Sequence, residues 1–246
     1  ILEPNGLAIR TKFGTVFHTG DSKIDPEPLL GELTDEALLK RIGDEGVLAM
    51  VCDSTNVFVE GEAGSEAMVR ANLRELLKGR TGRVAVTCFA SNLARVESIA
   101  LAAVAVGRHP VLSGPALLRM IEAAQDCGYM LDFPECVSPQ DGAYLPKDKV
   151  LFICTGSQGE PRASMAKIAN DEHRDLILEE GDTAIFSSRV IPGNERSVGR
   201  LQNALMASGV EVITDRDAGI HVSGHPARDE LVRVYQWVRP RIALPV

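Results

Sequence analysis

The chain contains 246 residues, of which 45% are hydrophobic, and carries 26 Lys and Arg against 34 Asp and Glu. This composition excludes an intrinsically disordered protein, and the length suits one large domain or two smaller ones. No apolar run approaches the ~20 residues of a membrane-spanning helix, and the N-terminus lacks the pattern of a secretory signal. We therefore expect a cytoplasmic protein with no membrane partner.

The net charge of −8 argues against a protein that holds nucleic acid through bulk electrostatics. Residues 181–246 nevertheless contain eight Arg against seven acidic residues. Since Arg offers several donors to a phosphate group, this part of the chain could form either a phosphate-binding face or a solvated surface. The five cysteines show no C-x-x-C spacing, and Cys52, Cys88 and Cys154 lie in apolar runs, so we expect reduced core residues.

Short apolar runs alternate with segments of 3.6-residue periodicity, which is typical of an α/β fold. Several central runs are apolar throughout, as expected for a mostly parallel sheet that helices cover on both faces. In chain order the sequence predicts strands at 7–10 and 14–18 joined as a hairpin, a helix at 35–42, a strand at 47–52, a helix at 64–77, a strand at 84–88, helices at 92–106 and 116–127, a strand at 150–154, a helix at 162–168, a strand at 183–186, a helix at 195–207, a strand at 210–213, a helix at 228–238 and a strand at 242–244.

Polar and small residues follow most of the predicted strands. In a sheet of parallel strands these positions gather at one edge, where ligands bind. Each segment also has a purely structural explanation as an Asx turn, a helix cap or a tight strand-to-helix turn, but together they favour a site. The segments are His18 to Asp21, Asp53 to Asn56, Phe89 to Asn92, Thr155 to Glu160, Ser187 to Arg189 and His221 to His225.

The Gly-Ser-Gln-Gly loop, Gly156 to Gly159, is the best phosphate candidate on physical grounds, because glycine allows close backbone approach and a helix N-terminus is expected to follow. It is neither a Walker motif nor a dinucleotide fingerprint. His221 and His225 fit either a polar site or a buried, hydrogen-bonded pair. His109 and His173 are expected at the surface. With Asp21 the two site histidines alone do not make a metal centre, because a catalytic zinc needs at least three protein ligands and an open position.

Six motifs, taken in chain order, resemble the ribonuclease J family across essentially the entire chain. They are His18 to Asp21, Asp53 to Asn56, Phe89 to Asn92, Thr155 to Pro161, Ile191 to Glu195 and His221 to His225. Members of this family are metallo-β-lactamase-fold nucleases with an inserted β-CASP domain, and the Ala- and Arg-rich sequence is similar to the proteobacterial branch. The resemblance implies part of a metallo-β-lactamase αββα fold plus a β-CASP domain with a mostly parallel sheet flanked by helices. The implied bounds are 1–45 for the metallo-β-lactamase portion, 46–215 for the β-CASP domain and 216–246 for a segment that returns to the first domain.

The resemblance also implies roles for single residues. Asp21 matches a carboxylate that bridges two divalent metal ions, Zn or Mn. Asp53 matches a carboxylate that orients a catalytic histidine, and His225 matches that histidine, which would protonate the leaving 3′ oxygen or stabilise the scissile phosphate. The residues implied in binding the substrate phosphate are Ser91, Asn92, Ser157, Gln158, His221, Val222, Ser223 and Gly224.

The sequence departs from the family pattern, because the motif H-x-H-x-D-H is absent and the His-Gly-Glu motif expected after Val246 is missing. We therefore expect an internal fragment that is inactive by itself. For the intact protein the resemblance implies a homo-oligomeric, metal-dependent ribonuclease with 5′-to-3′ exonuclease and endonuclease activity. Its substrate would be single-stranded RNA with a 5′ monophosphate, in mRNA decay and rRNA maturation. The alternative is a catalytically inactive β-CASP module that binds RNA or a partner protein, and a weaker one is a small-molecule metallo-hydrolase.

Overall fold

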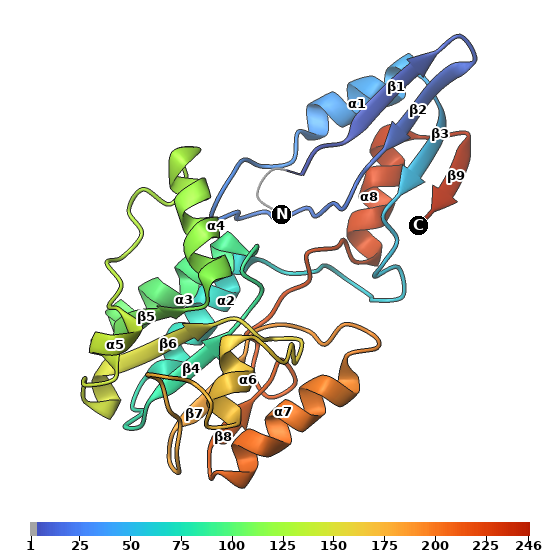
Figure 1. Ribbon diagram of the computed structural model, residues 1–246. Helices are drawn as coiled ribbons and strands as arrows, with labels where there is room; N and C mark the ends of the chain where they lie inside the picture. Colours follow the sequence, from blue (N-terminus) through green and yellow to red (C-terminus); the bar gives the residue numbers. More distant parts are fainter. Residues whose placement is uncertain (1–3) are drawn as a thin grey trace. The chain divides into compact units, whose positions relative to one another are not determined.

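The computed structural model describes residues 4–246 and divides them into two compact units (Figure 1). Unit 1 combines the N-terminal segment up to Glu66 with the C-terminal segment from Val222, and unit 2 is the continuous segment 67–221. The domain bounds implied by the resemblance, 1–45, 46–215 and 216–246, remain predictions. The compact units differ from them in placing residues 46–66 with the N-terminal segment.

Unit 1 contains a four-stranded sheet in the order β1-β2-β3-β9, with strands β1 (Leu7–Thr11), β2 (Gly14–His18), β3 (Val47–Cys52) and β9 (Ile242–Pro245). The hairpin β1-β2 is antiparallel, as predicted, whereas β2, β3 and β9 are parallel. Helices α1 (Glu36–Glu45) and α8 (Arg228–Val238) pack together. The buried side chains of Phe17, Met50 and Trp237 belong to the core that joins the helices to the sheet.

Helices α1 and α8 approach each other closely at Gly43. A Cβ atom at this position would lie 2.2 Å from the backbone oxygen of Trp237. We expect Gly43→Ala to lower the free energy of unfolding by about 1–3 kcal/mol, because the backbones must move apart. Gly199→Ala in α7 (Glu195–Ala207) is the matched control, since an added Cβ there has nothing within 4 Å. It should raise the free energy by about 0.5–1 kcal/mol. Denaturation midpoints of both variants test this, and a neutral Gly43→Ala would contradict the close packing.

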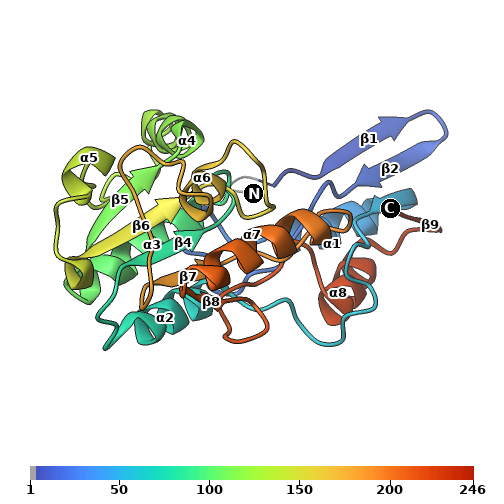
Figure 2. The same cartoon turned by 60° about the horizontal axis from the view of Figure 1, so that its bottom comes forward.

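Unit 2 is built on a parallel five-stranded sheet in the order β5-β6-β4-β7-β8 (Figures 1 and 2). Its strands are β4 (Val84–Thr87), β5 (His109–Ser113), β6 (Val150–Cys154), β7 (Thr183–Phe186) and β8 (Glu211–Ile213). The helices are α2 (Glu66–Leu77), α3 (Leu93–Ala105), α4 (Pro115–Asp126), the short α5 (Pro139–Gly142), a 3₁₀ turn (Lys147–Lys149), α6 (Ser164–Ala169) and α7.

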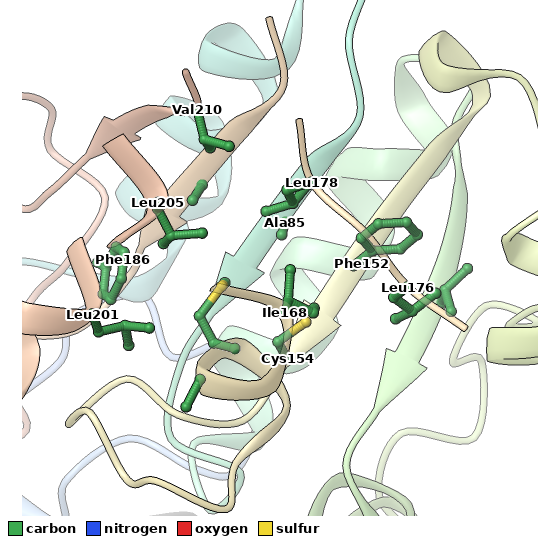
Figure 3. Close-up of a cluster of buried hydrophobic side chains, with 14 of the residues drawn as sticks. Ala85, Phe152, Cys154, Ile168, Leu176, Leu178, Phe186, Leu201, Leu205 and Val210 are labelled. Carbon is green, nitrogen blue, oxygen red and sulfur yellow. The ribbon is translucent and has the colours of Figure 1, made fainter. Parts of the chain in front are cut away.

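The core of unit 2 explains why its central strands are apolar on both faces. On one face Phe152 and Cys154 of β6 pack with Leu201 and Leu205 of α7 in a buried cluster (Figure 3). Side chains alternate along a strand, so Leu151 and Ile153, which are also fully buried, point to the opposite face. Helices α2, α3 and α4 cover that face (Figure 1). The predicted α/β fold, with a parallel sheet between two helical layers, is confirmed.

Strand β5 is the main element that the sequence patterns did not predict. It contains Pro110, which removes a ladder donor and disfavours a strand assignment. The sheet tolerates this proline because β5 is an edge strand. His109 follows the end of α3, as predicted, and begins β5, where it is exposed as expected. The ends of the predicted strands lie within one residue of the observed ones, and those of the helices within three.

Cys52, Cys88 and Cys154 are buried and form no disulfide, as predicted. Burial raises the pKa of the Cys52 thiol to about 11 and raises that of Cys154 as well, which makes both thiols unreactive at neutral pH. None of the helices formed by residues 4–246 combines the length and the apolar character needed to cross a membrane.

Candidate functional site

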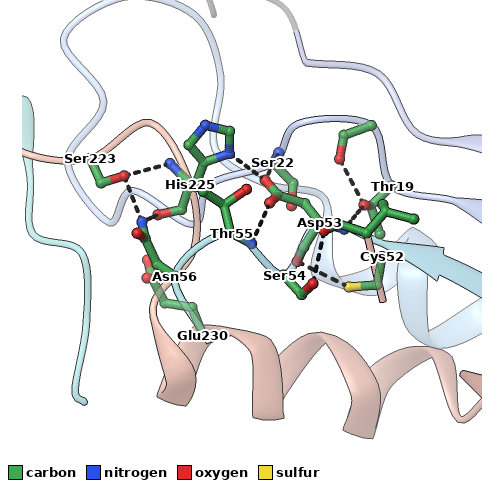
Figure 4. Close-up of polar contacts among 12 residues, drawn as sticks. Thr19, Ser22, Cys52, Asp53, Ser54, Thr55, Asn56, Ser223, His225 and Glu230 are labelled. Carbon is green, nitrogen blue, oxygen red and sulfur yellow. Dashed lines mark hydrogen bonds and ion pairs between the residues drawn. The ribbon is translucent and has the colours of Figure 1, made fainter. Parts of the chain in front are cut away.

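The clearest functional arrangement in unit 1 is a carboxylate paired with a histidine. Asp53 follows strand β3, and His225 lies in the loop that precedes α8. The Nδ1 atom of His225 is 2.7 Å from Oδ2 of Asp53, and Asp53 is only 5% exposed (Figure 4). Asp53 and His225 are thus in contact although they lie 172 residues apart in the sequence.

Three residues hold Asp53 in place. The backbone N–H of Thr55 donates to its Oδ1 at 3.1 Å, and the backbone N–H of Ser22 donates to its Oδ2 at 3.2 Å. The hydroxyl oxygen of Thr19, at the end of β2, accepts from the backbone N–H of Asp53 at 3.0 Å. The carboxylate is therefore oriented by local turn bonds and by a neighbouring loop, and both of its oxygens are used.

A second set of bonds fixes the loop that carries His225. The side-chain amide of Asn56 donates to the hydroxyl of Ser223 at 2.7 Å and to the backbone oxygen of His225 at 3.3 Å. The Ser223 hydroxyl also accepts from the backbone N–H of His225 at 3.1 Å. Glu230, which is fully buried, accepts from the backbone N–H groups of Ala227 and Ala63 at 2.6 and 3.0 Å. These contacts fix the start of α8 close to the pair of Asp53 and His225.

The hydrogen bonds decide the protonation of the pair. Burial alone would raise the pKa of Asp53, but its hydrogen bonds with His225, Thr55 and Ser22 outweigh burial and leave the pKa below its ordinary value. The carboxylate is thus ionised at neutral pH and can only accept. His225 must donate through Nδ1, so its Nε2 atom is the one that takes up or gives up a proton. This is the geometry of an oriented general acid or base.

Asp21 completes a group of three potential metal ligands with Asp53 and His225, whose ligand atoms all lie within 4.8 Å of one another. Both oxygens of Asp53 already accept hydrogen bonds, so that carboxylate suits an orienting role better than a ligand role. Asp21 is exposed and suits an oxygen ligand for a divalent cation. This group of three offers too few ligand atoms for a two-metal centre, and a metal-binding role for Asp21 remains a prediction.

Ser91 and Asn92 lie in unit 2, where the chain passes from β4 to α3. Ser91 is exposed, and Asn92, rather than Ser91, is the N-cap residue of α3. The Oδ1 atom of Asn92 accepts from the backbone N–H of Arg95 at 3.1 Å. The segment therefore does contain a helix cap, but the capping residue is Asn92 and not Ser91. Ser91 is exposed to solvent at the N-terminus of α3.

Ser157 and Gln158 are buried in unit 2. The amide of Gln158 holds the following loop, because its Oε1 accepts from the backbone N–H of Ile191 at 2.8 Å and its Nε2 donates to the backbone oxygen of Arg189 at 2.9 Å. The helix predicted from residue 162 begins at Ser164. A phosphate role for this loop, and for Ser157 and Gln158 within it, remains a prediction.

The segment from His221 to His225, called the HVSGH motif below, is divided between the two units. His221 is half-buried and is the last residue of unit 2, whereas Val222, Ser223, Gly224 and His225 belong to unit 1. Of the residues predicted to form the site, the structure brings together Asp21, Asp53, Ser223 and His225 within unit 1. The buried Val222 and the exposed Gly224 lie in the same loop.

A second histidine with a serine partner lies in unit 2, but its tautomer is wrong for nucleophilic catalysis. His173, which is half-buried rather than at the surface, has its Nε2 atom 3.0 Å from the hydroxyl of Ser113. Its Nδ1 accepts from the backbone N–H groups of Asp175 and Leu176. Nε2 therefore carries the proton and donates to Ser113, so His173 cannot remove a proton from that hydroxyl. Burial lowers the pKa of His173, which favours this neutral form.

Three further residues with buried or backbone contacts escaped the sequence patterns. Ser22 acts through its backbone N–H, which leaves no signature in the side chain. Glu230 stands three residues after Ala227, the spacing of a capping box whose first position lacks the usual Ser or Thr. Arg95 is a fully buried arginine in a largely apolar helix. A charged residue among apolar helix positions is the sequence feature that could have indicated it.

Comparison with known proteins places these features in a family. Residues 81–205 match the family model described as Ribonuclease J, beta-CASP domain. The chain is 50% identical over 246 residues to Ribonuclease J of Sinorhizobium meliloti, covering all of this chain and 44% of the relative. It is 43% identical to Ribonuclease J of Mycolicibacterium smegmatis over 98% of this chain and 43% of the relative. It is 36% identical to Ribonuclease J of Thermus thermophilus over 100% of this chain and 43% of the relative.

The parallel sheet of unit 2 and the matched model together define a β-CASP domain of the kind found in metallo-β-lactamase-type nucleases. The chain belongs to the ribonuclease J family. The similarity to the Sinorhizobium meliloti protein fits the proteobacterial branch that the sequence indicates. The chain spans less than half the length of these relatives.

Proposed function

We propose that the protein containing this chain is a metal-dependent ribonuclease in which His225 transfers a proton and Asp53 orients it. The single observation that carries this proposal is the 2.7 Å contact between Nδ1 of His225 and the buried, ionised carboxylate of Asp53. Membership of the ribonuclease J family supports the reaction class.

The chemistry assigned to this pair is hydrolysis of a phosphodiester. A water molecule attacks phosphorus, and its oxygen forms the new bond to phosphorus while its proton passes to solvent. The bond between phosphorus and the 3′ oxygen breaks, and the Nε2 proton of His225 passes to that oxygen as it leaves. Asp53 stabilises the positive charge of the imidazolium before the transfer and keeps the ring in one orientation. Two divalent cations, Zn or Mn, supply Lewis-acid stabilisation of phosphate charge when bound, and Asp21 is the residue of this chain that we assign to hold them.

The proposed substrate is single-stranded RNA with a 5′ monophosphate, cut by both 5′-to-3′ exonuclease and endonuclease action in mRNA decay and rRNA maturation. We assign its phosphate contacts to Ser91, His221 and the loop of Val222, Ser223 and Gly224. The net charge of −8 supports recognition through such local donors rather than through a broad basic surface. A homo-oligomeric state, which rests on the family resemblance, and a cytoplasmic location, which rests on the sequence pattern, complete the proposal.

The test is Asp53→Asn in the whole protein that carries this chain. An amide oxygen in place of Oδ2 can still accept from His225 and Ser22, but an amide nitrogen in place of Oδ1 cannot accept from the backbone N–H of Thr55. The substitution also removes the negative charge beside the ring. We expect RNA cleavage to fall by about 10- to 100-fold, as is usual when the partner that orients a functional histidine is lost. RNA binding should change little. The competing hypothesis, a module that binds RNA without cutting it, predicts no cleavage by the unaltered protein and would overturn the proposal.

A further inference from the structure

Arg95 is a charged residue in the interior of unit 2. It lies in the first turn of α3 and is 0% exposed. A guanidinium is always protonated and carries only donors, so its burial requires acceptors arranged around it. Those acceptors show what the residue holds in place.

The acceptors come from the ends of two distant segments. Nη1 of Arg95 lies 2.8 Å from the backbone oxygen and 2.9 Å from the hydroxyl of Ser187, which follows β7. It also lies 3.1 Å from the backbone oxygen of Ile220 and 3.4 Å from Nδ1 of His221. The Ser187 hydroxyl in turn donates to the Ile220 oxygen at 2.6 Å. The two hydrogens on Nη1 are thus shared among acceptors of Ser187, Ile220 and His221. Ile220 and His221 lie where the chain enters the HVSGH motif.

This contact determines the tautomer of His221. Arg95 can only donate, so the Nδ1 atom of His221 that faces it must accept. In that form the proton of the neutral ring sits on Nε2. The two histidines of the motif are therefore held in opposite tautomers, since His225 donates through Nδ1 to Asp53. A ring with Nε2–H donates to a phosphate oxygen and does not serve as a base.

We propose that Arg95 is a positioning residue that fixes His221 with Nδ1 as acceptor and Nε2–H as donor to an RNA phosphate oxygen. The inference rests on the proposed function, because the phosphate contact of His221 belongs to that proposal. The arrangement of Arg95, Ser187 and Ile220 is a property of unit 2 itself.

The same unit offers a matched control. Arg108 is also buried, at 3% exposed, and its guanidinium donates to the backbone oxygens of Gly82, Lys147, Val150 and Arg80. These contacts lie where β4, β5 and β6 begin, whereas Ser187 follows the end of β7. Arg108→Lys therefore also removes a buried guanidinium, but at the end of the sheet where the strands begin, away from His221.

The experiment measures cleavage of 5′-monophosphorylated single-stranded RNA by the whole protein and four variants: Arg95→Lys, His221→Leu, the double variant and Arg108→Lys. We expect Arg95→Lys and His221→Leu each to raise KM by about 10-fold, the scale of one hydrogen bond to a charged group, with kcat changed less than about 3-fold. The double variant should be no worse than His221→Leu, because Arg95 acts through His221. Arg108→Lys should lower the melting temperature and leave KM unchanged.

A spectroscopic measurement separates this inference from the proposed function. In protein with ¹⁵N-labelled histidine, the His221 signals, assigned by their loss in His221→Leu, should show an unprotonated Nδ1 and a protonated Nε2, and should shift in Arg95→Lys. Multiplied KM effects in the double variant, an equal KM rise in Arg108→Lys, or a protonated Nδ1 would each overturn the role of Arg95. Absence of RNA cleavage in the unaltered protein would overturn the proposed function, while the nitrogen signals still decide the tautomer.

Discussion

Replacing His225 with Ala in the whole protein is expected to lower the rate of RNA cleavage by about 10²–10⁴-fold, the usual contribution of a positioned acid or base. The reason is geometric. Asp53 fixes the ring through Nδ1 at 2.7 Å, and no other imidazole within residues 4–246 forms a hydrogen bond with that carboxylate. RNA binding should be largely retained, because the phosphate contacts are assigned mainly to other residues. Single-turnover cleavage and equilibrium binding of the same RNA provide the measurement.

His109→Ala is the matched control for this variant. His109 is exposed at the start of β5 and has no place in the proposed site, so its loss should leave both cleavage and binding within about 2-fold of the unaltered protein. Equal losses of cleavage and of binding in His225→Ala would show that His225 holds the RNA rather than transferring a proton, and would contradict the assigned role.

Phe152→Ala is expected to lower the free energy of unfolding by about 3–5 kcal/mol, the cost of truncating a buried phenylalanine. Phe152 is 1% exposed and belongs to the cluster between the sheet of unit 2 and helices α6 and α7 (Figure 3). A whole domain is commonly stable by only about 5–15 kcal/mol, so this single change removes a large share of that stability. Urea or thermal denaturation followed by circular dichroism measures it.

Phe58→Ala is the same chemical change at an exposed position. The side chain of Phe58 is 89% exposed in the loop after β3, so its loss should change the free energy of unfolding by less than about 0.5 kcal/mol. Comparable destabilisation by the two variants would contradict the assignment of Phe152 to the core.

Much of the fold is visible in the sequence because the local patterns agree with the tertiary structure. The runs 47–52 and 150–154 are apolar throughout, and both form strands at those residues. Helix α7 was predicted with its observed ends because its apolar positions recur with helical spacing. Strand β5 was missed because its burial comes from pairing with β6, a contact between distant residues that outweighs the unfavourable Pro110.

The site is predictable only where its residues form a recognisable motif. Asp53 and His225 could be named from the family pattern, and their contact then appears in the structure. The partners that fix them are less visible, since Ser22 acts through its backbone and Glu230 through the start of α8. The amide of Gln158, in a glycine-rich loop predicted to contact phosphate, makes hydrogen bonds with the backbone of Arg189 and Ile191 that no local pattern indicates. Sequence patterns identify residue types, but long-range contacts decide which partners they meet.

The central claim is that the pair of Asp53 and His225 delivers a proton to the leaving 3′ oxygen. The most direct test is single-turnover cleavage of two RNAs that differ only in the bridging atom at the scissile position, 3′ oxygen or 3′ sulfur, by the unaltered protein and by His225→Ala. A thiolate leaves without protonation, because a thiol has a pKa of only about 8.5. We predict that His225→Ala loses about 10²–10⁴-fold with the oxygen substrate and less than about 10-fold with the sulfur substrate. An equal loss with both substrates would contradict proton transfer by His225.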